Sequence, residues 1–377
     1  MTDIYFRTDG NSEIATGHLM RCLSIARACV KKSAKVKFIV SDEQSLALLQ
    51  ERFSFPLEFG IRCLHSDYTN MMPELPALSA LAAQDNASPA NLNSYKPWIF
   101  VDSYYVTPAY LLSLRESFRV AYLDDLRSFD CPVDLVINYD TDQDCAYYAK
   151  AERRLLGMQY TPLREQFNGT AYTVRPTVEH ILLSTGGTDP YAVAEHLLNA
   201  VYRGLTADMP RLQSLHYHIL TSSANARYDA LAGYARMYPN VHVHEGVLDV
   251  ASLMASCDLA VCAGGTTLCE LCAVGVPTVS YLMADNQRTA VETYAALELI
   301  PYAGDIRPGA AAGYSVNTTV SSDSTSLPPI NDAVISSALS FVTYMSQNWS
   351  ARQKSSQSMR AFLSGTGANQ IACALLS

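Results

Sequence analysis

Short apolar segments alternate with helical segments along most of this chain, and this alternation limits the folds that it can adopt. Between the expected strands, apolar residues recur with the spacing of an amphipathic helix. The expected strands are residues 4–6, 36–40, 98–102, 120–123 and 135–138 in the first half, and 180–184, 215–220, 241–244, 259–262 and 277–282 in the second. The pattern predicts an α/β chain of two doubly wound Rossmann-like domains that face a cleft. Their ligands are expected beyond the carboxyl ends of parallel strands.

The length of 377 residues is too great for one ordinary core and fits two domains. A polar segment at 160–176 carries two prolines and a glycine, which favours a linker. We therefore expect an N-terminal domain at 1–168 and a C-terminal domain at 169–345. C-terminal helices are expected at 346–377, and packing back on the N-terminal domain is one arrangement open to them.

Composition argues against several classes of partner. The formal net charge of -9 and the pI of about 5.4 disfavour binding to nucleic acid or to an anionic membrane. No window reaches ~18 uninterrupted apolar residues, and the N-terminus lacks the regions of a signal peptide. The ten cysteines lie mostly in apolar segments without a matched metal-ligand pair. We therefore expect a cytoplasmic monomer with reduced cysteines, no metal and no cofactor.

The segment RTDGNSEIATGHLMRC, residues 7–22, joins the first expected strand to a helix. Gly17 is expected to allow a tight turn, and His18 to be the first or second residue of that helix. The positive end of the helix dipole disfavours an imidazolium, so the ring is expected to stay neutral and to be able to act as a base. A simple role in capping the helix is the alternative. Asp9 in the same loop fits either a turn former or a residue that orients a ligand.

Polar residues also follow the other strands of the first half, and the parallel topology is expected to gather them along one edge of the sheet. These residues are Arg7, Asp9, Asp102, Tyr104, Asp124 and Asn138.

A second loop, CAGGTTLCEL at 262–271, joins a strand through two glycines directly to a helix. The free amides and the helix dipole at such a junction can hold a diphosphate without a lysine. Close packing of the glycines and a solvated Glu270 are the alternative. STGGTDP at 184–190 follows another strand of the same half and is a second possible anion site. DNQ at 285–287 also follows a strand; its polar side chains are expected at the ligand edge, and the same residues can start a helix. The candidate binding residues are Gly187, Gly265, Thr266, Thr267, Glu270, Asn286 and Gln287, together with Arg7 and Gly17.

These motifs together resemble the UDP-sugar hydrolase family of pseudaminic acid biosynthesis, whose substrate is UDP-2,4-diacetamido-2,4,6-trideoxy-β-L-altropyranose. Further segments that carry the resemblance are VDSYY at 101–105, YLDDL at 122–126, LLGMQYTPLREQF at 155–167 and GTGANQI at 365–371. The resemblance implies a GT-B fold with a sugar-binding, catalytic N-terminal domain and a UDP-binding C-terminal domain. It places the catalytic histidine at His18, an active-site tyrosine at Tyr104 and a nucleotide-side asparagine at Asn286. Residues 66–97 and 294–314 depart from the family pattern.

The expected activity is a metal-independent, inverting hydrolysis of the UDP-sugar. UDP is a good leaving group, so a base at His18 and amides around Gly265 could suffice, with Asp9 and Tyr104 as further catalytic candidates. One alternative is a GT-B glycosyltransferase with a UDP-sugar donor. A hydrolase of another nucleotide sugar, and a protein that binds nucleotide sugars without turnover, also remain open.

Overall fold

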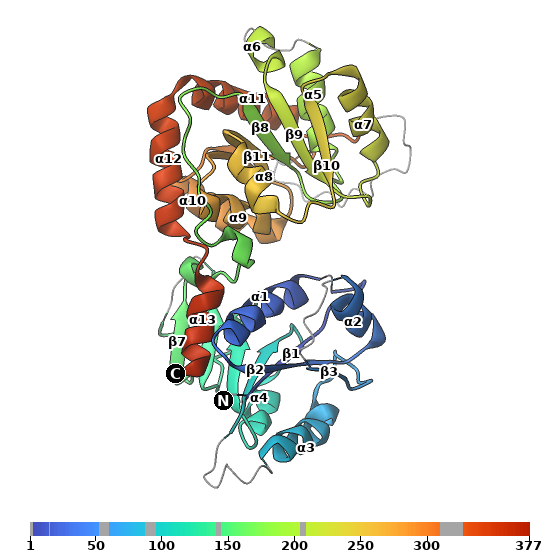
Figure 1. Cartoon of the computed structure of the whole chain (residues 1–377), viewed down its shortest axis with the longest axis vertical. Coiled ribbons are helices and arrows are strands. Elements are labelled where there is room, and N and C mark those ends of the chain that lie inside the picture. The colour runs from blue at the N-terminus through green and yellow to red at the C-terminus, as the bar shows by residue number, and fades with distance from the viewer. Residues whose placement is uncertain are drawn as a thin grey trace. The chain divides into compact units, whose positions relative to one another are not determined.

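The computed structural model describes residues 3–14, 16–52, 60–86, 96–140, 145–203, 209–309 and 327–377. The chain divides into two compact units: Met1–Glu165 with Thr366–Ser377, and Gln166–Gly365. Each unit is built on one parallel sheet with helices against it, which confirms the predicted pair of doubly wound Rossmann-like domains (Figure 1). The cleft between them and the assignment of sugar and UDP to separate domains stay predictions.

The sheet of the first unit has the strand order β3-β2-β1-β4-β5-β6-β7, and its paired strands are parallel. Its strands are β1 Asp3–Thr8, β2 Lys35–Val40, β3 Gly60–Cys63, β4 Trp98–Asp102, β5 Arg119–Leu123, β6 Leu135–Asn138 and β7 Arg153–Leu156. Its helices are α1 Gly17–Lys31, α2 Glu43–Ala47, η1 Leu48–Arg52, η2 Met72–Glu74, α3 Leu75–Asn86, α4 Pro108–Leu114, η3 Met158–Tyr160, η4 Glu165–Phe167 (which extends into the second unit) and α13 Gly367–Leu376.

Alternate residues of each strand point to opposite faces of this sheet. Both sets are mostly apolar in the central strands, so both faces are apolar. On one side, Phe6 and Phe38 stack with ring centroids 5.2 Å apart, in a core that includes residues of α1 and α13. On the other side, Tyr5 and Val101 belong to a second core with residues of α3 and α4. The central strands are therefore buried, and only residues past their ends can reach a ligand.

The sheet of the second unit has the order β10-β9-β8-β11-β12-β13, again with parallel pairs. Its strands are β8 His180–Ser184, β9 His216–Thr221, β10 Val241–Glu245, β11 Leu259–Ala263, β12 Thr278–Leu282 and β13 Tyr302–Asp305. Its helices are α5 Val193–Tyr202, α6 Met209–Gln213, α7 Tyr228–Met237, α8 Val250–Ser256, α9 Thr266–Val274, η5 Asp285–Gln287, α10 Arg288–Ala296, α11 Asp332–Gln347 and α12 Trp349–Phe362.

The direction of strand order reverses between β1 and β4 in the first unit and between β8 and β11 in the second. Ligands of open parallel sheets bind beyond the carboxyl ends of the strands at such a reversal. Thr8 and Asp102 end the first pair of strands, and Ser184 and Ala263 end the second pair. Each unit thus has one favoured place for a site.

The C-terminal segment expected at 346–377 is divided between the units. Helix α12 belongs to the second unit, whereas α13 returns to the first, where Ile371 and Leu375 join the core beside α1 (Figure 1). Arg153 of β7 also donates to the carbonyl of Ala374 at 2.8 Å.

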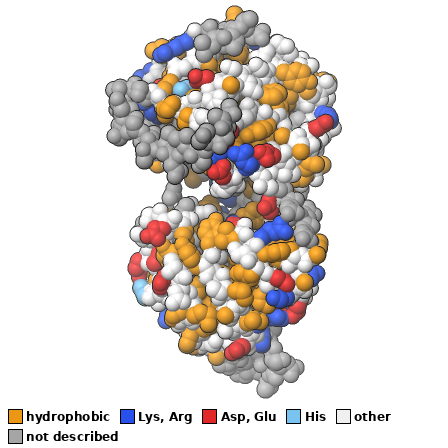
Figure 2. Space-filling model, turned by 180° about the vertical axis from the view of Figure 1, so that it is seen from behind, with side chains coloured by type: hydrophobic (Ala, Val, Ile, Leu, Met, Phe, Trp, Pro, Cys, Tyr) orange, Lys and Arg blue, Asp and Glu red, His pale blue; other side chains and the backbone are white. Residues whose placement is uncertain are grey.

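The surface has mixed charge on the face that Figure 2 shows, where Lys and Arg side chains lie among Asp and Glu side chains over the described residues. Within the described ranges, no helix has the length and hydropathy that crossing a bilayer requires.

Candidate functional site

His18 is the second residue of α1, as the sequence predicted, and it lies against the last residue of β4. Its Nδ1 is 2.6 Å from Oδ1 of Asp102. Both side chains are almost fully buried. Since α1 follows β1, this contact lies at the carboxyl ends of β1 and β4, the two strands between which the order reverses.

Arg21 binds the other side of the same carboxylate. Its Nε donates to Oδ2 of Asp102 at 2.5 Å, and its Nη2 donates to Oδ1. Its Nη1 also donates to Asp125 and to the hydroxyl of Tyr139, each at 2.6 Å. Burial alone would raise the pKa of Asp102, but Arg21 and His18 outweigh it and lower that pKa to about 2. Asp102 is therefore ionised at neutral pH.

An ionised carboxylate can only accept hydrogen bonds, so the contact with His18 requires a proton on Nδ1 of the ring. Arg21 Nη2 lies 2.9 Å from the same nitrogen, but a protonated Nδ1 cannot accept, so Nη2 donates to Asp102 Oδ1. In a neutral ring, Nε2 then carries the lone pair. The arrangement fixes the tautomer in which Nε2 can accept a proton.

Tyr104 lies beside this histidine, two residues past the end of β4. The two rings meet edge to face, with centroids 4.4 Å apart. The tyrosine is 45% exposed. Burial and then the charge of Asp125 raise the pKa of its hydroxyl, so it stays a neutral hydrogen-bonding group near pH 7.

Arg7 and Asp9 do not join His18. Arg7 is fully buried, and its guanidinium donates to Asp9 at 2.5 Å and to both oxygens of Glu74 at 2.9 Å. Glu74 also accepts from the hydroxyl of Tyr110 at 2.5 Å, and Asp9 accepts from the amide of Ser41 at 2.6 Å. With their polar atoms used inside the unit, Arg7 and Asp9 are better placed to hold the loop before His18 than to touch a ligand.

Asp124 and Asn138, which were expected at the same edge, form a third group. The hydroxyl of Tyr148 donates to Asp124 at 2.9 Å, and the Nδ2 of Asn138 donates to that hydroxyl at 2.9 Å. Asp124 also accepts from the amides of Leu126 and Arg127. These groups hold the loop after β5.

Gly17 begins α1 without a positive φ, so its own conformation does not require the freedom of a glycine that the expected tight turn implied. A Cβ built there would meet no atom within 4 Å. Its predicted role in binding therefore depends on this open space and not on backbone strain.

In the second unit, Gly265 caps the first turn of α9 without a hydrogen bond from any side chain. Thr266 is exposed and Thr267 is partly exposed, so the amide end of this helix faces outward. Gly264 is required by packing, because a Cβ there would lie 2.0 Å from Cγ2 of Val291. At Gly265 a Cβ would meet only Nε2 of Gln287, at 3.8 Å, so that glycine is not required by packing.

Three loops of this unit meet at the carboxyl edge of β8, β11 and β12. Gln287 lies over Gly264 and Gly265, and its Oε1 accepts from the amide of Met283 at 3.1 Å. A Cβ on Gly186 would lie 3.7 Å from Cε of Met283. The structure thus brings the glycine loop, DNQ and the STGGTDP loop together, as their places after neighbouring strands predicted.

The second possible anion site, at the start of α5, is already filled by the protein. Asp189 accepts from the amides of Val193 and Ala194 at 2.9 and 3.0 Å. Burial raises the pKa of this carboxyl to about 6. Gly187 is exposed in the preceding loop, where its carbonyl accepts from Ser222 at 2.8 Å. The start of α9 is therefore the better anion site of the two.

Of the remaining candidates, Glu270 is 8% exposed on α9, so it is not a solvated surface charge. Asn286 is exposed beside Gln287. Within the described residues, three potential metal ligands converge at Glu43, Cys63 and His65 on another part of the first unit. They have no bond to His18 or Asp102.

Sequence reasoning missed three residues of the histidine site: Arg21, Asp125 and Tyr139. Arg21 could have been found, because residues three apart on a helix share a face with each other, and His18 is three positions earlier. Asp125 and Tyr139 follow strands β5 and β6, but only the packed structure shows that both reach Arg21.

No family model matches the chain. The spore coat polysaccharide biosynthesis protein SpsG of Bacillus subtilis is 26% identical over 166 residues, which are 43% of this chain and 48% of that protein. The UDP-N-acetylglucosamine--N-acetylmuramyl-(pentapeptide) pyrophosphoryl-undecaprenol N-acetylglucosamine transferase of an Exiguobacterium species is 34% identical over 93 residues. These are 23% of this chain and 26% of the transferase. The chain thus matches less than half the length of either relative.

Solved structures match over the whole chain. MurG of Acinetobacter baumannii superposes with a TM-score of 0.63 at 12% identity, covering 100% of this chain and 99% of MurG. UGT2 of Phytolacca americana gives 0.58 at 10% identity and covers 100% of both chains. The UDP complex of UGT89C1 from Arabidopsis thaliana gives 0.54 at 12% identity and covers 100% of both chains. This chain has the GT-B fold of these glycosyltransferases, which confirms the fold that the sequence resemblance implied.

Proposed function

We propose that this protein is an enzyme that cleaves the bond between UDP and the anomeric carbon of a sugar, with His18 as the base. The observation that carries the proposal is the contact between His18 Nδ1 and an ionised Asp102, which leaves the lone pair on Nε2. A histidine held in this way can take a proton from an attacking hydroxyl or water. The Asp102 carboxylate then stabilises the imidazolium that forms.

The second unit would bind the UDP part. The uncapped start of α9 offers backbone amides and the positive end of a helix dipole, both of which favour a phosphate. Charge develops on the departing diphosphate, so this is where amides lower the barrier most. Gln287 and Glu270 flank the loop and supply polar groups for the nucleotide.

The attacking group separates two candidate reactions. Transfer of the sugar to an acceptor hydroxyl is favoured by the transferase named among the relatives and by the glycosyltransferase structures with the same fold. Hydrolysis remains the second candidate for one reason in this structure. His18 is only 4% exposed, and water reaches a buried base more easily than a bulky acceptor does. The resemblance of the 7–22 segment to the UDP-sugar hydrolases points the same way.

The test is phosphorus NMR of the purified protein with UDP-N-acetylglucosamine, and with UDP-2,4-diacetamido-2,4,6-trideoxy-β-L-altropyranose, in EDTA. UDP released without acceptor indicates hydrolysis, and UDP released only when a sugar or lipid-linked acceptor is added indicates transfer. His18→Ala should lower either rate by ~10²- to 10⁴-fold. UMP with a sugar phosphate would overturn the proposal, because it requires cleavage within the diphosphate.

UDP binding is tested separately on the second unit. Gly265→Ala should fold normally, since the new Cβ contacts only the end of Gln287. It should lower the affinity for UDP by ~10-fold or more if a phosphate approaches this backbone closely. His18→Ala is the matched control and should bind UDP like the wild type. Equal UDP affinity in Gly265→Ala and wild type would remove the phosphate from this loop.

A further inference from the structure

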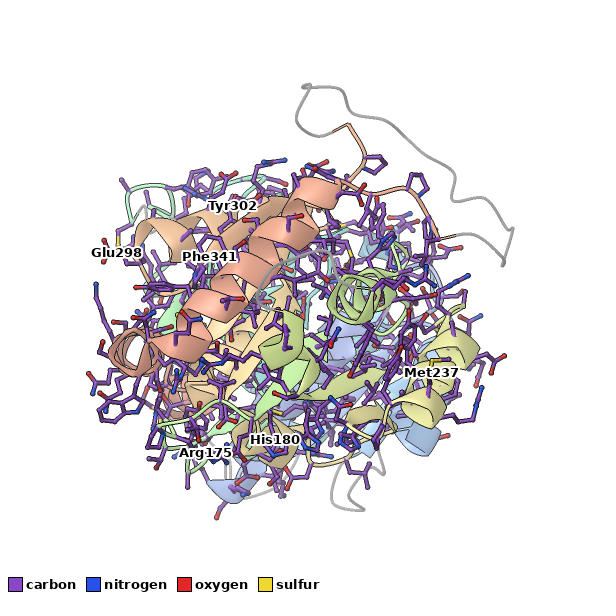
Figure 3. All side chains as sticks on the ribbon, turned by 90° about the horizontal axis from the view of Figure 1, so that it is seen from above. Arg175, His180, Met237, Glu298, Tyr302 and Phe341 are labelled. Carbon is purple, nitrogen blue, oxygen red and sulfur yellow. The ribbon has the colours of Figure 1, made fainter. Side chains whose placement is uncertain are left out.

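Five of the eight histidines of the chain lie on one face of β8, β9 and β10. They are His180, His216, His218, His242 and His244, which we call the histidine face. Their neighbours on these strands, Tyr217, Ile219 and Val241, point to the opposite face and belong to the core that includes residues of α5 and α11. In Figure 3, His180 and Phe341 of α11 lie to either side of this sheet.

The imidazoles of this face are hydrogen-bonded to one another. His216 Nδ1 lies 3.1 Å from His242 Nε2, and His218 Nδ1 lies 3.0 Å from His244 Nε2. His180 Nδ1 lies 2.9 Å from His218 Nε2. Each contact brings two nitrogens together, of which one must be an unprotonated acceptor. All five side chains are partly exposed, so the face is open to small solutes.

Electrostatics favour the neutral ring at three of the five histidines. Burial, and then the four neighbouring histidines, lower the pKa of His218 to about 4. Burial and neighbouring histidines also lower the pKa of His242 and His244. The carboxylate of Asp258 accepts from the backbone amide of His180, and Arg175 pairs with the same carboxylate at 2.6 Å. Protonation of these three rings is therefore disfavoured in the folded unit.

We propose that the histidine face binds a divalent transition-metal ion, such as zinc, between His216 Nδ1 and His242 Nε2. Imidazole is a preferred ligand of these ions. Metal–nitrogen bonds of ~2.0–2.1 Å at tetrahedral angles separate two ligand nitrogens by roughly 3.3 Å. The present separation of 3.1 Å needs to open only slightly. Water completes the coordination, with His180 and His218 as the nearest further imidazoles.

The proton balance of this binding is simple. In the hydrogen bond between His216 and His242, one ring carries its proton in the gap. That proton moves to the outer nitrogen of the same ring, which no side chain in the described part of the chain binds. Both lone pairs then face the ion, and neutral rings release no proton. His218 is less suited, because both of its nitrogens already have histidine partners.

The proposal is tested on the full chain with zinc chloride, by calorimetry and by NMR of protein labelled with nitrogen-15 at histidine. Zinc should shift His216 Nδ1 and His242 Nε2 in the wild type. His242→Asn should weaken binding to this face by at least ~10-fold, since loss of even an outer-shell partner costs ~10- to 100-fold.

His65→Asn is the matched control, because it removes the separate Glu43, Cys63 and His65 group. It should leave the His216 and His242 shifts unchanged. Zinc signals confined to His65, or no shift of His216 and His242 in the wild type, would overturn the proposal. The wild-type measurement decides even if His242→Asn folds poorly.

Discussion

At the scale of single residues, Asp102 organises the candidate catalytic group. It accepts hydrogen bonds from His18 and Arg21, which both lie on α1. The carboxylate is fully buried; Arg21 balances its charge, and His18 and the thiol of Cys22 donate to it. A buried charge without a partner is strongly destabilising, which explains why Arg21 in turn is held by Asp125 and Tyr139.

Asp102→Asn should lower UDP release by ~10²- to 10⁴-fold, because an amide can also donate to Nδ1 of His18 and then no longer requires a proton there. His18 could then turn its lone pair away from the reacting hydroxyl. The measurement is the rate of UDP release as a function of pH, with circular dichroism as the check on folding.

Asp130→Asn is the matched control for that experiment, because Asp130 accepts from the amide of Lys150 on a loop of the same unit and forms no hydrogen bond with His18 or Arg21 among the described residues. It should retain wild-type activity. If Asp102→Asn kept the wild-type rate and pH profile, Asp102 would have no role in holding the histidine.

The sequence was sufficient to place His18, Tyr104 and the glycine loop after apolar strands, and their roles stay predictions. It could not show that Arg7 is buried. The Glu74 that binds it lies 67 positions away, in a region where the sequence pattern was weak. Helical spacing places Arg21 beside His18, but the sequence could not show its bond to Asp102, which spans 81 positions. Polar side chains at a strand end either face a ligand or pair internally, and only packing decides between the two.

At the scale of elements, the strands that were not predicted are β3, β7 and β13, and all three are edge strands. Edge strands pack on fewer neighbours, so they need fewer apolar residues. β7 begins with two arginines, and β3 alternates exposed and partly buried positions. The central strands were predictable because burial on both faces requires continuous apolar sequence.

The histidine face should make the second unit sensitive to acid. The pKa of His218 is about 4 in the folded protein, whereas an unfolded histidine titrates near ~6.5. The unfolded chain therefore binds more protons between these values. Stability is fully present above pH ~6.5 and is lost as the pH falls toward 4. Thermal unfolding should show a falling midpoint between pH 7 and pH 4.5.

His218→Asn should flatten this pH dependence, since it removes the ring with the most strongly lowered pKa and two of its contacts. His65→Asn is the control, because His65 is exposed in the first unit. An equal loss of stability with acid in His218→Asn and wild type would place the acid sensitivity elsewhere.

At the scale of the whole molecule, the chain ends by returning to the unit where it began. α12 completes the second unit, and Gly367 then opens α13 against the first, where a Cβ would lie 2.2 Å from the carbonyl oxygen of Thr161. The sequence pattern gave the C-terminal helices but could not decide where they pack, because an amphipathic helix fits any apolar surface of the right width.

Ile371→Ala tests this return. Ile371 is fully buried in the core shared with α1, so the truncation should lower the free energy of unfolding of the first unit by ~2–5 kcal/mol. Hydrogen exchange should then speed up in α1 and β7, more than 190 positions earlier in the chain, and not in the neighbouring α12. Ile335→Ala on α11 is the matched control and should loosen the second unit instead, since Ile335 lies in its core. Faster exchange in α12 after Ile371→Ala would show that α13 stabilises the second unit, and the division of the chain would need to be redrawn.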